Sequence, residues 1–97
     1  MGRVDDPARE TTITIYVRLT RAGGIERATF RTFGCSACVA ASSMATEVLV
    51  GMGRPQAVAF SAEALDAALG GLPVDKRYCA ELVAEAVRRA FSSGRDR

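Results

Sequence analysis

The chain has 97 residues, which is enough for one folded domain and too few for two. Hydrophobic residues make up 48% of it, so the chain can bury a core, which argues against a disordered protein. Thirteen basic and eleven acidic residues leave a net charge of +2, and this balance is too even to indicate nucleic acid or an anionic membrane as a partner.

Two absences narrow the class of protein further. No apolar run approaches the roughly 20 residues that span a bilayer, and the start of the chain has no apolar segment typical of a signal peptide. We therefore expect a cytoplasmic protein, in which three cysteines more often bind metal, react or lie buried than form disulfides. The chain has no His, so His ligands and His general bases are excluded, and we do not expect an enzyme.

The first third of the chain predicts a hairpin. Residues 1–10 are polar and include Pro7, so we expect a flexible N-terminal tail. Apolar and polar residues then alternate from Ile13 to Leu19, which is the period of a strand with one buried face. Residues 21–24 contain the glycines of a turn, and a second alternating segment runs from Ile25 to Phe33.

The remaining residues predict helices. From residue 36 to residue 50 the apolar side chains recur at helical spacing, until the glycines and proline of residues 51–55 end the pattern. Residues 56–60 can form a helical turn. Ser61 then precedes residues 62–69 in the position of an N-cap, which predicts a further short helix.

The last helix completes the predicted domain. Asp75 can cap its start, and the apolar pattern runs to about Phe91, after which residues 93–97 form a C-terminal tail. Residues 11–92 are therefore expected to form a single α+β domain. Its architecture would be a two-stranded antiparallel hairpin followed by three to four helices packed on one face.

Two cysteines lie where helices are expected to begin. Cys35 follows Gly34 at the start of the long helix, and Cys79 lies just behind Asp75 in the last one. The positive end of a helix favours a thiolate, the form that binds metal or attacks sulfur, so we expect both thiols to gain this effect. The alternative for both residues is that they are small buried side chains.

Cys38 forms a Cys-x-x-Cys motif with Cys35, which is typical of a redox pair or of half a zinc site. A mononuclear zinc site with four Cys or His ligands from one chain is excluded, because the chain has no His and no second such motif. Cys38 also lies on the apolar face of the predicted helix, so a core position is as good an interpretation as a ligand.

Two separated segments resemble the NifU/IscU-type family of iron–sulfur cluster assembly scaffolds. Residues 28–47, which read ATFRTFGCSACVAASSMATE, resemble the family's central motif. Residues 72–82, which read LPVDKRYCAEL, resemble its Leu-Pro segment, after which a Cys opens a long final helix. The resemblance extends over roughly residues 13–92 and implies the IscU-like fold.

The resemblance also implies a ligand set, and the chain departs from it. Cys35 matches the second family cysteine and Cys79 the third. The first cysteine should fall near residues 7–9 and an Asp near Thr11, and neither is present. Tyr78 stands where the family has His, and Cys38 where it usually has Ala. We expect the family's opening helix and first strand to be missing, as in an N-terminally truncated, divergent member.

The implied function is an iron–sulfur cluster scaffold or carrier that handles iron or sulfur through Cys35 and Cys79, with Cys38 as a further metal ligand. The implied partner is a cysteine desulfurase or another sulfur donor. One alternative is a binding module or accessory subunit that kept the fold and lost the cluster. The other is a zinc-binding or redox dimer that uses Cys35 and Cys38.

A homodimer is expected on two grounds. A hairpin without a third strand leaves open edges that invite pairing with a second chain. One chain also offers two or three cysteines, whereas iron–sulfur clusters are generally held by four thiolates. Among the thiols, Cys35 is expected to be the most reactive.

Overall fold

A computed structural model of the chain describes residues 1–94, with the backbone alone for Arg54, Val58 and residues 92–94. Three strands come first in the chain and the helices follow. The elements are β1 (Gly2–Asp6), the 3₁₀ turn η1 (Pro7–Arg9), β2 (Thr11–Leu19), β3 (Ile25–Phe33), α1 (Ser36–Leu49), α2 (Arg54–Val58), α3 (Ala62–Ala68), the 3₁₀ turn η2 (Val74–Lys76) and α4 (Arg77–Gly94).

The strands form one antiparallel sheet in the order β1-β2-β3. Ile15 of β2 pairs with Phe30 of β3, and Ile13 pairs with Val4 of β1, so the apolar side chains of all three strands share a face. Ile13 and Ile15 are completely buried there. The α+β class and the hairpin of β2 and β3 are therefore confirmed.

The expected N-terminal tail and two-stranded sheet are wrong, because residues 2–6 form β1 beside β2. The strand alternates in burial: Gly2 and Val4 face the core, and Arg3 and Asp5 face outward. A Cβ at Gly2 would clash with the α4 backbone at Ala86, so glycine lets β1 approach the helix. The family's first strand was expected to be missing, and β1 occupies a place beside β2.

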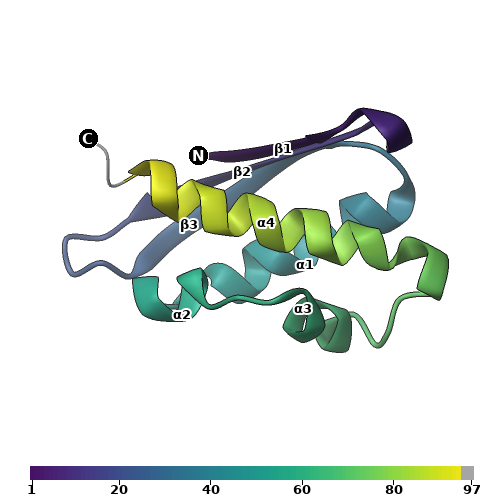
Figure 1. Cartoon of the computed structure of the whole chain (residues 1–97). Helices are drawn as coiled ribbons and strands as arrows, with labels where there is room; N and C mark the ends of the chain where they lie inside the picture. Colours follow the sequence, from purple (N-terminus) through teal and green to yellow (C-terminus); the bar gives the residue numbers. More distant parts are fainter. Residues whose placement is uncertain (95–97) are drawn as a thin grey trace.

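The helices form a second layer on one face of the sheet. α1 packs against β3, α4 packs against β1 and β2, and the two helices contact each other. α3 packs on both helices and α2 packs on α4, and Figure 1 shows this pair on the side of the molecule opposite β1. The core between the layers contains two cysteines, Cys38 and Cys79, among its aliphatic and aromatic side chains.

The ends of the helices differ in part from expectation. Ser61 caps α3 as predicted, because its hydroxyl accepts a hydrogen bond from the Ala64 N–H. Asp75 does not cap α4: it lies inside η2, and α4 begins only at Arg77. α4 continues to Gly94, so it takes in part of the expected C-terminal tail, and residues 95–97 lie outside the described residues. Among the helices of residues 1–94, none is long and apolar enough to cross a membrane.

Candidate metal centre

Three elements bring the cysteines together. Cys35 ends the turn after β3 and is the N-cap of α1, Cys38 lies in the first turn of that helix, and Cys79 is the third residue of α4. Gly34 makes this turn possible, since a Cβ there would press against the Thr11 side chain at 3.2 Å. The three Sγ atoms all lie within 4.8 Å of one another.

The three sulfurs form a triangle with one accessible corner. Cys35 Sγ lies 3.8 Å from both Cys38 Sγ and Cys79 Sγ, and the latter two lie 2.6 Å apart. Cys38 and Cys79 are completely buried, whereas Cys35 is partly exposed. The two interpretations of Cys38 are thus compatible, because it is a core residue and a corner of the thiol triangle at once.

The surroundings of Cys35 favour its thiolate. Burial alone would raise the pKa of Cys35, but hydrogen bonds from the Cys38 backbone and from the Tyr78 hydroxyl outweigh it and lower the pKa to about 6. A backbone N–H at a helix start and a phenol donor are both groups that stabilise a negative sulfur. At neutral pH Cys35 is therefore largely a thiolate at the surface of the triangle.

The two buried thiols behave in the opposite way. Burial raises the pKa of Cys38, and it also raises the pKa of Cys79, where the hydrogen bond with Cys38 adds to the effect. The expectation that the helix start would activate Cys79 as it activates Cys35 is therefore wrong. Loss of hydration outweighs the helix dipole at a position that is closed to water.

A second layer of hydrogen bonds fixes the first turn of α1. The Ser42 hydroxyl donates to the Cys38 carbonyl oxygen at 2.9 Å and is 2.8 Å from the Thr32 hydroxyl on β3. Ser42 is completely buried, so these contacts lie inside the core. They tie the helix turn that carries Cys38 to the sheet and so hold this corner of the triangle in place.

A tyrosine and an arginine stand over the exposed corner. The Tyr78 hydroxyl oxygen is 3.7 Å from Cys35 Sγ, and the Arg9 guanidinium lies 4.4 Å from the centre of the Tyr78 ring. Arg9 also pairs with Asp6 at 2.8 Å. Arg9 is a neighbour of the site that was not predicted from the sequence. The resemblance placed a missing ligand at residues 7–9, so this position was a signal that could have identified it.

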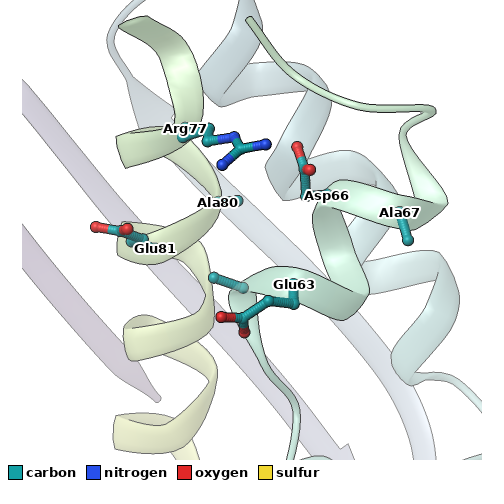
Figure 2. A pocket seen from close by; sticks show the side chains of 7 residues that line it. Glu63, Asp66, Ala67, Arg77, Ala80 and Glu81 are labelled. Carbon is teal, nitrogen blue, oxygen red and sulfur yellow. The ribbon is translucent and has the colours of Figure 1, made fainter. Parts of the chain in front are cut away.

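A separate hollow of about 200 Å³ lies between α3 and α4 and does not include the cysteines. Glu63 and Asp66 line it from α3, and Arg77 and Glu81 line it from α4, together with three alanines. Figure 2 shows the Arg77 guanidinium extending toward Asp66 across this space. The hollow is therefore mainly acidic at its polar wall and lacks the thiols that a soft metal would need.

Comparison with known proteins gives a consistent result. The family model of the NifU-like N terminal domain matches residues 1–97. The iron-sulfur cluster assembly scaffold proteins IscU 1 and IscU 2 of Archaeoglobus fulgidus are each 42% identical over 91 residues, which cover 94% of this chain and 59% of theirs. The scaffold protein IscU of Azotobacter vinelandii is 32% identical over 89 residues, which cover 92% of this chain and 69% of that protein.

One solved structure, of a protein described as hypothetical, superimposes with a TM-score of 0.57. The match covers 95% of this chain and 73% of the other, at 22% sequence identity, so it supports the fold alone. The chain spans about three fifths of the length of the Archaeoglobus relatives, 59% of each.

Proposed function

The chain belongs to the family of NifU-like N-terminal domains, and from this membership we propose that it is an iron–sulfur cluster scaffold or carrier. The observation that carries the proposal is the triangle of Cys35, Cys38 and Cys79, whose sulfurs lie within 4.8 Å of one another. Thiolates are the ligands that iron–sulfur clusters and soft metal ions prefer. The cluster or its iron is the cargo of the protein, and we assign no catalytic residue.

The cysteines of the triangle differ in burial, and we assign them different roles. Cys35 is the accessible corner and largely a thiolate, so it makes the first contact with iron or with a sulfur donor. Cys38 and Cys79 must lose their protons as the metal enters, so binding releases protons and weakens as the pH falls. A cysteine desulfurase or another sulfur donor fits as partner, and the cytoplasm fits as a compartment that keeps three thiols reduced.

The decisive experiment is anaerobic reconstitution of the reduced chain with iron and inorganic sulfide. We expect a visible charge-transfer absorption with bound iron and sulfide, and its loss in Cys35→Ser. Ser36→Ala is the matched control, because Ser36 is exposed next to Cys35 and makes no part of the triangle. Absence of both chromophore and metal would favour a module that lost the cluster, and stoichiometric zinc without a chromophore would favour a zinc protein.

We also propose that the cluster joins two chains. The argument from a missing third strand no longer applies, because β1 fills that place. The argument from the number of ligands still applies, because one chain offers three cysteine thiols and clusters generally take four thiolates. Sedimentation equilibrium should give a mass near 10.3 kDa for the metal-free chain and twice that mass after reconstitution. A reconstituted chain that remains a monomer would contradict the dimer.

A further inference from the structure

The oxidation state of sulfur poses a problem that the thiol triangle can solve. Sulfur carried on a protein thiol is a persulfide, whose outer atom is sulfane sulfur and must gain two electrons to become the sulfide of a cluster. Two thiols that join in a disulfide release two electrons. A scaffold with spare thiols beside its sulfur-accepting cysteine therefore has its own source of reducing power.

The geometry separates an accepting thiol from a reducing pair. A donor can reach Cys35, which is partly exposed, and cannot reach Cys38 or Cys79, which are completely buried. Both buried sulfurs lie 3.8 Å from Cys35 Sγ, so either can approach a persulfide formed there. Cys35 and Cys38 also form a Cys-x-x-Cys at a helix start, an arrangement in which an exposed first thiol is resolved by a buried second one.

The distance between the buried sulfurs indicates where the oxidation ends. Cys38 Sγ and Cys79 Sγ are 2.6 Å apart, which is only about half an ångström longer than a disulfide bond of about 2.05 Å. The two buried sulfurs are therefore the closest pair in the triangle. A disulfide that included Cys35 would have to draw together sulfurs 3.8 Å apart.

We propose that Cys38 and Cys79 reduce a persulfide on Cys35 to sulfide and end as a buried disulfide; this rests on the proposed function in iron–sulfur assembly. The Cys35 sulfur first attacks the outer sulfur of a donor persulfide, R–S–SH, and the donor leaves as its thiol. One buried sulfur then attacks Cys35 Sγ. The S–S bond of the persulfide breaks, and the outer sulfur leaves as hydrosulfide with the electron pair of that bond.

Exchange between neighbouring thiols completes the step. The second buried sulfur attacks the first, so the Cys38–Cys79 bond forms and Cys35 is released as a free thiol. The balance is R–S–SH plus two buried thiols giving R–SH, hydrogen sulfide and one disulfide. The sulfane sulfur is reduced by two electrons, and the two thiols are oxidised by two.

The sequence of events has a consequence for the metal site. The disulfide removes two of the three thiols of the triangle, so sulfide release and metal binding alternate in one chain. A dithiol with a lower reduction potential must reopen the disulfide before the next metal is bound. The oxidation state of Cys38 and Cys79 thus controls whether the site can bind metal.

The test treats the reduced, chelated chain anaerobically with one equivalent of glutathione persulfide and traps free sulfide with a bimane reagent. We expect about one sulfide per chain, a mass lower by two hydrogens and a Cys38–Cys79 cross-link after digestion. Cys35 should remain free and react with iodoacetamide. A cross-link that contains Cys35 as the final product, or a persulfide that stays on the chain, overturns the proposal.

Variants of Cys38 and Cys79 distinguish the role of the buried pair from the role of each cysteine alone. Cys38→Ala with Cys79→Ala should keep the persulfide on Cys35 and slow sulfide release by at least about tenfold. Each single variant should release sulfide but finish with Cys35 in the disulfide, so that iodoacetamide no longer labels it. Ser36→Ala should match the unmodified chain, and equal release from the double variant would show that the buried pair is not the reductant.

The same samples separate this inference from the proposed function. Reconstitution with inorganic sulfide bypasses the persulfide and tests cluster binding alone. A chain that binds the cluster but releases no sulfide from glutathione persulfide keeps the function and refutes the inference. A chain that releases sulfide and forms the buried disulfide, yet takes no cluster, supports the inference and refutes the scaffold.

Discussion

The two helix starts that carry the cysteines treat their thiols in opposite ways. At the start of α1, Cys35 is an N-cap with a partly exposed sulfur, and its pKa falls to about 6. At the start of α4, Cys79 is the third residue of the helix and is completely buried, and its pKa is raised. The two positions share the positive end of a helix and differ in access to water.

Burial raises the pKa of both thiols, so the direction of the hydrogen bonds, and not the helix dipole, accounts for the difference between them. A helix terminus stabilises a negative charge by about 0.3–1 kcal/mol at the surface, whereas full burial of an ionised group shifts its pKa by up to several units. A thiol gains from a helix start only while hydrogen-bond donors remain directed at it. The Cys38 backbone and Tyr78 donate to Cys35 and outweigh its burial, whereas the hydrogen bond of Cys79 with Cys38 adds to the effect of burial.

Alkylation should distinguish these thiols most clearly in the metal-free, reduced chain. Cys35 should react with iodoacetamide at least about a hundredfold faster than Cys79 or Cys38, because it is a surface thiolate and the other two need the structure to open. Timed alkylation with peptide mapping measures the three rates. If Cys38 were modified first, the orientation assigned to the first turn of α1 would be wrong.

The same substitution at the two helix starts should change stability unequally. Cys79→Ser places a hydroxyl in the core and should lower the free energy of unfolding by about 1–3 kcal/mol. Cys35→Ser places a hydroxyl at the surface and should change it by no more than about 0.5 kcal/mol. Urea unfolding followed by circular dichroism compares them, and equal losses would contradict the difference in burial.

A substitution beside the far end of α4 tests how the buried thiols become exposed. Gly2→Ala introduces a clash between β1 and the α4 backbone at Ala86, and should cost about 1–3 kcal/mol of stability. If Cys79 reacts only when the whole helix detaches, its alkylation should accelerate by about tenfold in this variant, while Cys35 keeps its rate.

The outcome of that experiment distinguishes global from local opening. Unchanged alkylation of Cys79 would show that the start of α4 opens by itself. Gly24→Ala serves as control, because a Cβ at Gly24 meets atoms only at ordinary contact distances of 3.6 Å or more. The control should leave both alkylation rates unchanged.

Local patterns were sufficient for much of the fold. The alternation of Ile13 and Ile15 with polar neighbours predicted β2 and its inward face, and Gly34 before Cys35 predicted the turn into α1. β1 was missed because Val4 is its only large apolar residue. Its other inward residue, Gly2, is recognisable only when the opposing backbone of α4, more than 80 residues away, is known.

The site was predictable in its members and not in its geometry. Cys35 and Cys79 were named from sequence, but the contact between Cys38 and Cys79 joins residues 41 positions apart and depends on how α1 packs against α4. The pKa of Cys79 follows from that packing as well. Arg9 was not predicted because its role comes from stacking on Tyr78, a residue far from it in the sequence.

Tyr78 should have a smaller effect, because it acts on Cys35 through one hydrogen bond from the start of α4 to the start of α1. Tyr78→Phe removes the hydroxyl 3.7 Å from Cys35 Sγ and keeps a ring for Arg9 to stack on. Because that hydroxyl stabilises the thiolate, its loss should raise the pKa of Cys35 above about 6, while the Cys38 backbone holds it below the ordinary value of 9.0. The rate of alkylation against pH should therefore keep its shape, with the inflection moved to higher pH.

Tyr16→Phe is the control, since Tyr16 is an exposed residue of β2 that does not contact the triangle, and it should leave the inflection in place. An inflection that stays near 6 in Tyr78→Phe would assign the activation of Cys35 to the helix start alone, and a fall in pKa would contradict the donor role of the phenol.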